Sequence, residues 1–259
     1  MTTVLLYLLM AWVALTVLAY FAADRMMFLP PPSSYDARSL PVVHVEADDD
    51  VRIAVLHLPN PDARLTILYS HGNAEDLGHL APLLHELRDA GFAVIGYDYR
   101  GYGASTGGPP TAHGAFRDIE AVYRYTTEDL RVAPDRVVLY GRSVGSGPAT
   151  WLAARAPVGG LILESAFTSA FVVVTRVAIL PFDRFPNLRV IRDMDVPVLV
   201  IHGTNDEVIP FRHGQRLYDA APGPKQSLWV DGARHNDVAW VAGGEYFDAL
   251  HRFEALLRE

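Results

Sequence analysis

The stretch Gly141-Arg142-Ser143-Val144-Gly145 decides the fold of this chain. It fits the pattern G-x-S-x-G, in which a serine occupies a strained turn between a β-strand and a helix and exposes its hydroxyl group. Glycines on both sides of the serine suit a turn that needs unusual φ/ψ angles and close backbone approach. The pattern alone is equally compatible with an ordinary Gly-Ser turn, so its surroundings have to decide.

The flanking residues favour the strained turn. Residues 135–140 have the pattern of a short buried strand, and residues 147–154 can start and continue a helix. A strand before the serine and a helix after it are the context that the pattern requires. Ser143 is therefore predicted to be an exposed nucleophile.

Outward from this turn, short apolar segments alternate with helical ones, which is typical of βαβ units and a parallel sheet. Further strands are expected at residues 65–70, 92–97, 160–164, 198–202 and 226–230, and helices at 77–90, 114–130 and 245–257. Residues 42–46 and 51–58 are expected to form an antiparallel hairpin around the acidic turn at 48–50. The sequence thus predicts an α/β protein with a mostly parallel twisted sheet, helices on both faces, and a short cap within residues 165–197.

The N-terminus is a separate apolar segment, because residues 1–23 carry no charged side chain before Asp24. About twenty such residues can span a bilayer as a helix. A cleaved signal peptide would need a positively charged start and a small-x-small cleavage pattern, and a buried core helix would have a polar face. We therefore predict an N-terminal transmembrane anchor at 1–23, a proline-rich linker at 24–35 and a catalytic domain at 36–259. Arg25 and Arg38 follow the span, which favours a cytoplasmic catalytic domain, but so few charges specify the orientation poorly.

Composition limits the classes of function. With 259 residues and 50% hydrophobic content the chain can form one large domain, and a net charge of -8 argues against a nucleic-acid partner. The chain has no cysteine, which excludes disulfides, a thiolate nucleophile and a cysteine-bound metal. The histidines lack metal-ligand spacing and no H-E-x-x-H occurs, so neither a metal nor a cofactor is expected. Oligomeric state stays open.

A serine hydroxyl needs a base to take its proton and a third group to orient that base. Asp206 directly follows the predicted strand at 198–202, and His235 directly follows the one at 226–230. Both should project from the carboxyl edge of the sheet, and the chain order Ser, Asp, His is the one that accompanies this motif. We predict Ser143 as nucleophile, His235 as base and Asp206 as the acid that orients it.

Each of these assignments has an alternative. Asp206 could instead cap a turn or the following helix, with Glu164 at the end of its own strand as the acid, whereas Glu207 should point away. His235 could be a surface loop histidine. His71 is interpreted as loop scaffolding, and Arg142 as a packing or hydrogen-bonding residue.

The carbonyl oxygen of a substrate becomes negative when the serine attacks, so hydrogen-bond donors must face it. The N–H groups of Val144, directly after the nucleophile, and of Asn73, in the loop at 71–74, are the predicted oxyanion hole. The glycine-rich segment at 98–105 lacks the lysine and the spacing of a phosphate-binding loop, so it is interpreted as structural.

Taken together, these stretches resemble the α/β-hydrolase superfamily, and within it the membrane-associated serine hydrolases that include protein depalmitoylases. The resemblance is carried by residues 70–78, 98–105, 141–145, 182–187, 198–209 and 228–237. It implies the α/β-hydrolase fold, with Ser143 as nucleophile, Asp206 as acid and His235 as base. The chain departs from the depalmitoylases at its N-terminus, where an apolar segment stands in place of a cysteine-rich, acylated one.

These observations predict a membrane-anchored serine hydrolase that cleaves carboxylic esters or thioesters of lipophilic acyl groups. Its expected partners are the acyl substrate and the lipid bilayer. The apolar run at 170–180 could line an acyl groove or simply pack on the sheet. A peptidase or amidase using the same residues, and a non-catalytic membrane-tethered binding module on a hydrolase scaffold, are the alternatives.

Overall fold

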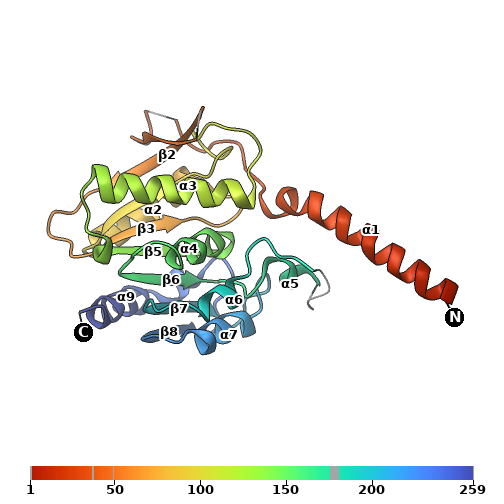
Figure 1. Cartoon of the computed structure of the whole chain (residues 1–259). Coiled ribbons are helices and arrows are strands. Elements are labelled where there is room, and N and C mark those ends of the chain that lie inside the picture. The colour runs from red at the N-terminus through yellow and green to blue at the C-terminus, as the bar shows by residue number, and fades with distance from the viewer. Residues whose placement is uncertain (1, 37, 49, 176–180, 259) are drawn as a thin grey trace.

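The computed structural model describes residues 2–36, 38–48, 50–175 and 181–258. Its strands are β1 (Val43–Asp48), β2 (Val51–Leu58), β3 (Thr66–Ser70), β4 (Ala93–Tyr97), β5 (Val137–Arg142), β6 (Gly160–Glu164), β7 (Val198–Gly203) and β8 (Lys225–Val230). In the described residues they form one eight-stranded sheet in the order β1-β2-β4-β3-β5-β6-β7-β8 (Figure 1). Strands β3 to β8 run parallel, and β2 runs antiparallel to both β1 and β4.

Helices cover both faces of this sheet (Figure 1). One face packs against α3 (Ala112–Arg124), α4 (Ser146–Ala153), α6 (Asn187–Ile191) and α7 (Arg212–Ala220), and the other against α2 (Leu77–Asp89), α8 (Val238–Ala242) and α9 (Gly244–Leu256). Alternate residues of a strand point to opposite faces, so Val137 and Leu139 of β5 enter one core while Val138 and Tyr140 enter the other. The predicted mostly parallel sheet with helices on both faces is confirmed.

The elements beside Ser143 differ in detail from the prediction. Residues Pro134–Arg136 form a 3-10 turn, and β5 then runs to Arg142, directly before the serine. A second 3-10 turn, Ser143–Gly145, precedes α4. The strand therefore delivers Ser143 straight into a tight turn at the start of a helix, as the nucleophile motif requires.

Of the short helices, α6 lies within the predicted cap and α7 is the helix that follows Asp206, whereas α8 was not predicted from the sequence. In α7 the buried positions are His213, Gly214 and Leu217, so its inward face carries one large apolar side chain and the apolar spacing does not define its bounds. The predicted cap contains α5 (Ala170–Thr175). The predicted apolar run at 170–180 continues past α5 into residues 176–180, which lie outside the described residues.

The N-terminal helix α1 (Thr2–Met27) projects from the body of the domain, on the side where α5 lies (Figure 1). It continues four residues past the end of the predicted apolar segment at residue 23. Within the part of the chain that the structure describes, it is the one helix whose length and composition would let it cross a membrane, and no part of its most apolar stretch is buried. Its C-terminal end contacts the domain, as described below.

The stability of the fold should depend on the protonation of His213. Its side chain is 1% exposed, and burial together with the charge of Arg212 lowers its pKa from 6.5 to about 4. Its Nδ1 atom accepts a hydrogen bond from the backbone N–H of Thr168 at 3.3 Å, which requires the neutral ring. The unfolded chain therefore binds a proton that the native state does not bind between about pH 4 and pH 6.5, so stability falls as the pH falls through this window.

The free energy of unfolding should fall between pH 7 and pH 5 in the wild type, and we expect this decrease to be smaller by about 2 kcal/mol in His213→Asn. Urea unfolding of the protein in detergent at both pH values measures it. His113, an exposed histidine of α3, supplies the matched control, and His113→Asn should leave the difference unchanged. An unaltered pH dependence in His213→Asn would contradict the argument.

Candidate active site

Ser143 lies on a left-handed turn, with φ of 51°. Only close backbone approach allows this turn: a Cβ atom on Gly145 would lie 2.1 Å from the carbonyl oxygen of Ser70, and one on Gly141 would lie 2.6 Å from that of Gly145. Any residue larger than glycine at these two positions would push the turn away from the sheet. The two glycines of the motif therefore fix the place of the serine, and the strained φ keeps its side chain clear of β5 and α4.

The side chains of Ser143, His235 and Asp206 form one line of hydrogen bonds. The Ser143 hydroxyl donates to His235 Nε2 at 3.0 Å, and His235 Nδ1 donates to Asp206 Oδ2 at 2.7 Å. Asp206 follows β7 and His235 follows β8, so both arrive from loops at the carboxyl edge of the parallel strands. An aligned hydroxyl, imidazole and carboxylate can move a proton from the serine to the histidine.

Asp206 is held as a carboxylate by its surroundings. Its Oδ1 atom accepts the backbone N–H groups of Val208 at 2.9 Å and Ile209 at 2.7 Å. Burial alone would raise the pKa of this carboxyl group, but hydrogen bonds from His202 and His235 outweigh burial and lower it well below its usual value. The carboxylate is therefore ionised at neutral pH and can stabilise a protonated His235.

His202 is part of this arrangement, and sequence analysis missed it. Its ring is fully buried; Nε2 donates to the carbonyl oxygen of Ile209 at 2.9 Å and lies 3.4 Å from Asp206 Oδ2. It thus holds both ends of the turn that carries the carboxylate. The only local signal was a histidine four residues before Asp206 at the end of an apolar strand.

Glu164, the alternative acid, lies elsewhere in the site. Its Oε2 atom accepts the Tyr246 hydroxyl at 2.8 Å and also the hydroxyl of Tyr140, and its Oε1 atom lies 3.4 Å from Arg142 Nε. None of the hydrogen bonds found among the described residues joins it to His235. Glu207, the neighbour of Asp206, is exposed, and no hydrogen bond or ion pair found among the described residues joins it to His235.

The loop after β3 carries Asn73, which lines the same cavity as Ser143 and Val144. The side-chain oxygen of Asn73 accepts three hydrogen bonds, from the Leu29 N–H at 2.8 Å, the Tyr102 hydroxyl at 2.8 Å and the Ala74 N–H at 2.9 Å. The side-chain oxygen is thus occupied by protein groups, and what this residue can offer a ligand is N–H donors, including that of its backbone.

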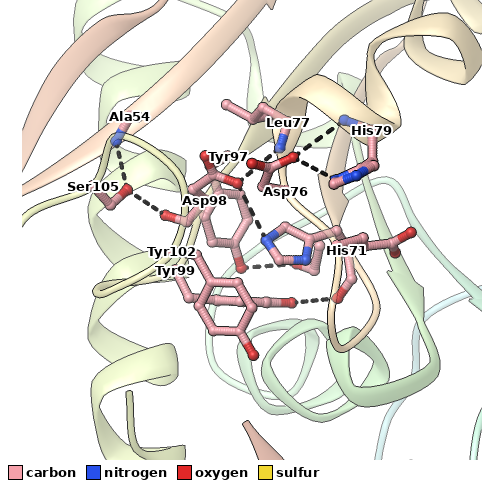
Figure 2. Close-up of polar contacts among 12 residues, drawn as sticks. Ala54, His71, Asp76, Leu77, His79, Tyr97, Asp98, Tyr99, Tyr102 and Ser105 are labelled. Carbon is pink, nitrogen blue, oxygen red and sulfur yellow. Dashed lines mark hydrogen bonds and ion pairs between the residues drawn. The ribbon is translucent and has the colours of Figure 1, made fainter. Parts of the chain in front are cut away.

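A buried polar network supports this loop from beneath (Figure 2). His71 is fully buried; its Nδ1 atom donates to the Gly72 carbonyl at 2.7 Å and its Nε2 atom lies 3.5 Å from Asp98 Oδ1. Tyr99 donates its hydroxyl to the His71 carbonyl at 2.8 Å, and Asp98 accepts the Leu77 N–H at 2.9 Å. Burial lowers the pKa of His71, but the hydrogen bond and charge of Asp98 outweigh it and raise the pKa. His71 is therefore scaffolding, as interpreted from the sequence.

Arg142 joins the three loops of the site. Its Nη1 atom donates to both oxygens of Glu75 at 2.7 and 2.9 Å, and its Nη2 atom donates to the Asn236 side-chain oxygen at 2.9 Å. Glu75 in turn accepts the Gly72 N–H at 2.5 Å. Burial lowers the pKa of Arg142, but the carboxylates of Glu75 and Glu164 outweigh it and keep the guanidinium charged. The guanidinium thus ties the serine turn to the loop of Asn73 and to the loop of His235.

We expect Arg142→Met to lower kcat/KM for an activated ester by about 10²-fold, because Glu75 would no longer hold the Gly72-Asn73 backbone in place. The loss of one oxyanion donor costs about 10² to 10³ in rate. Arg142→Lys should recover part of the activity, since it restores the charge without the fork of donors.

The matched control is Arg155→Met, whose guanidinium lies over the Trp151 ring at 4.7 Å on the outside of α4. It should keep full activity. Arg142→Met also leaves buried carboxylates unpaired, which could destabilise the fold. Circular dichroism at the assay temperature therefore distinguishes misfolding from displacement of the Gly72-Asn73 backbone. A folded Arg142→Met protein with unchanged kcat/KM would contradict this role.

A cavity of about 380 Å³ opens beside Ser143. The polar part of its lining surrounds the serine and consists of Asn73, Glu75, Arg142, His235 and Asn236. The rest of the wall is apolar and is formed by Met26, Met27, Val144, Phe167, Ala170, Val173, Val208 and Ile209. In residues 2–36, 38–48, 50–175 and 181–258, no group of three or more acidic, histidine or cysteine side chains is placed to hold a metal ion.

Comparison with known proteins gives matches over most of the chain. A family model described as "Serine aminopeptidase, S33" matches residues 61–190. "Alpha/beta hydrolase domain-containing protein 17B" of Homo sapiens is 41% identical over 198 residues, which cover 75% of this chain and 67% of the human protein. The protein of the same name from Xenopus laevis is 40% identical over 199 residues, 75% of this chain and 68% of its own length.

Among solved structures, the esterase Pf2001 of Pyrococcus furiosus has the same fold. Its TM-score is 0.72 at 19% sequence identity, over 87% of this chain and 98% of the esterase. The sequence matches, the eight-stranded sheet and the serine turn agree with one another. The chain therefore belongs to the α/β-hydrolase family of serine hydrolases and, within it, to the group of α/β-hydrolase domain-containing proteins 17.

Proposed function

We propose that this protein is a membrane-anchored hydrolase that cleaves carboxylic esters or thioesters of lipophilic acyl groups through an acyl-Ser143 intermediate. The observation that carries the proposal is the position of the Ser143 hydroxyl: it is hydrogen-bonded to His235 at 3.0 Å and faces a cavity whose wall is mostly apolar. An apolar cavity with a few convergent polar groups suits an acyl chain that ends in a reactive carbonyl.

In the first half of the reaction His235 Nε2 takes the proton of Ser143 as the serine oxygen bonds to the acyl carbon. Asp206 orients the imidazole and stabilises the imidazolium that forms. The N–H groups of Val144 and Asn73 donate to the negative oxygen of the tetrahedral intermediate. His235 then gives its proton to the departing alcohol or thiol, which leaves Ser143 acylated.

In the second half a water molecule takes the place of the leaving group. His235 removes its proton as it attacks the acyl carbon, and the same N–H groups hold the oxygen again. Collapse of this intermediate returns the proton to Ser143 and releases the fatty acid. The balance of the two halves is one ester or thioester and one water consumed, and one acid and one alcohol or thiol formed.

The proposed anchor is α1, and the proposed setting is the bilayer surface. An enzyme held at the membrane meets lipid-borne acyl groups at high effective concentration. The resemblance to protein depalmitoylases suggests thioesters of acylated proteins as one substrate class. Esters of lipids are the other.

The family model's description favours aminopeptidase activity as a second candidate. An aminopeptidase needs a carboxylate to bind the free α-amino group of its substrate. Glu75 is the one acidic side chain among the described residues that line the cavity, and both of its oxygens are held by Arg142. This occupancy favours acyl esters over peptides with a free N-terminus.

The test is activity-based labelling of the detergent-solubilised full chain with a fluorophosphonate, followed by mass spectrometry of the labelled peptide. The proposal expects the label on Ser143 and competition by esters and thioesters of long acyl chains. Faster turnover of an aminoacyl amide than of the matched ester would favour the peptidase instead. Absence of any label on Ser143 would overturn the acyl-enzyme mechanism.

A further inference from the structure

The end of α1 forms part of the wall of the catalytic cavity. Met26 and Met27, its last two residues, line this cavity together with Phe167, Ala170 and Val173. Met26 is 62% exposed, and Val208, also in the lining, is 49% exposed. Two large apolar side chains thus stand uncovered at the mouth of a site whose interior is apolar, where a bound chain would cover them.

The residues directly after α1 fix its end to the domain. Phe28 is 3% exposed and packs edge-on against Phe185, with ring centres 6.2 Å apart, and against Tyr99 at 6.0 Å. The next residue, Leu29, donates its N–H to the side chain of Asn73. Met26 and Met27 are therefore held next to the loop that carries Asn73.

A second set of contacts is made by residues of α1 that precede these methionines in the sequence. The Arg184 guanidinium lies over the Tyr20 ring at 4.5 Å, donates to the Tyr20 carbonyl at 2.7 Å and lies 3.4 Å from the carboxylate of Asp24. Asp24 also accepts the N–H of Ala112, the first residue of α3, at 3.2 Å. These contacts attach the last two turns of α1 to the hydrolase domain.

These contacts also set the height of the cavity above a bilayer. The apolar part of α1 ends at Ala23, and the first charged side chain is Asp24. A helix rises 1.5 Å per residue, so Met26 lies only about 4.5 Å along the axis beyond Ala23. Tyr20, near this boundary, is of the type that favours the membrane interface. If α1 spans the bilayer, the cavity mouth opens at its surface.

We infer that the last turn of α1 is a part of the acyl-binding site, and that the acyl chain of a bilayer-borne substrate reaches Ser143 along Met26 and Met27. This inference rests on the proposed function. The chain lies between these methionines on one side and Phe167, Ala170 and Val173 on the other, with its carbonyl carbon at the serine. Methionine is unbranched and flexible, which suits contact with a mobile hydrocarbon chain. The anchor therefore contributes to acyl-length selectivity as well as to location.

The test compares chain-length profiles of the full-length protein in detergent micelles, with p-nitrophenyl esters from acetate to palmitate. Met27→Trp fills the cavity, so it should lower kcat/KM for long chains by at least about tenfold and leave acetate within about twofold. Met26→Ala removes exposed apolar surface with little effect on folding, and it should raise KM for long chains only. Met10→Trp and Met10→Ala, at an exposed methionine of α1 far from the cavity, should match the wild type.

The outcomes separate this inference from the function on which it rests. Unchanged chain-length profiles in both Met26→Ala and Met27→Trp, with normal acetate turnover, would overturn the inference and leave the hydrolase assignment intact. A wild-type protein that hydrolyses none of the esters would overturn both. The same variants assayed in phosphatidylcholine vesicles, with either a palmitoyl-thioester peptide or a lysolipid, identify which carrier delivers the chain.

Discussion

Replacing Ser143 with alanine should reduce hydrolysis of acyl esters by about 10⁵- to 10⁶-fold. In serine hydrolases that share this arrangement, loss of the nucleophile costs about as much as loss of all three groups. Without the Ser143 hydroxyl no acyl-enzyme can form, and His235 has no nucleophile to deprotonate. The decrease should appear in kcat, and fluorophosphonate labelling should disappear with it.

Ser146→Ala is the matched control, since it removes the same hydroxyl three residues along the chain. The Ser146 hydroxyl donates to the Ser143 carbonyl at 2.6 Å and accepts the side-chain N–H of Asn187 at 3.0 Å. These bonds stabilise the turn at 143–145. We expect a decrease of less than about tenfold, consistent with one lost neutral hydrogen bond. Substantial ester turnover by purified Ser143→Ala would exclude an acyl-serine intermediate.

Replacing Asp206 with asparagine should lower kcat by about 10⁴-fold with little change in the fold. The same substitution in a serine protease has an effect of this size, because the amide leaves the histidine in the wrong tautomer. Here the geometry gives the same reason: His235 Nδ1 donates to Asp206 Oδ2 at 2.7 Å, and an asparagine side chain can offer an N–H group at that position. Ester hydrolysis as a function of pH and circular dichroism together test this expectation.

Two neighbouring carboxylates supply the comparison. Glu207→Gln changes the adjacent exposed residue and should leave kcat within about twofold. Glu164→Gln tests the other acid at the sheet edge, which is bound by Tyr140, Tyr246 and Arg142 and should affect stability more than chemistry. A nearly normal Asp206→Asn protein together with an inactive Glu164→Gln protein would transfer the role of the acid to Glu164.

The arrangement of Ser143, Asp206 and His235 could be predicted because it follows from topology. Each residue comes directly after a strand of a parallel sheet, and the carboxyl ends of such strands meet at one edge. Local signals were therefore enough: an apolar run, then a loop with the right side chain. The same logic predicted the sheet, its opening hairpin and the helices α2, α3, α4 and α9.

The contacts that hold the site together could not be read from the sequence. Arg142 pairs with Glu75, which lies 67 residues earlier, and Asn73 accepts the N–H of Leu29, which lies 44 residues earlier. No periodicity or spacing encodes such pairs, because they depend on how loops from separate strands fold over the edge. The bounds of α7 were not predicted for a different reason: its buried face has one large apolar side chain, Leu217, beside His213 and Gly214.

The attachment of Tyr20 and Phe28 to the hydrolase domain has a practical consequence for protein engineering. Upstream of Tyr20, no described residue of α1 lines the catalytic cavity, so that part is the place to exchange the anchor for another tether. Truncation past Met27 would open the cavity to solvent, and truncation past Phe28 would also remove its buried ring, at a cost of about 3 kcal/mol or more. A water-soluble form intended to keep its acyl selectivity should therefore begin at or before Tyr20, even though the motifs of the enzyme begin some fifty residues later.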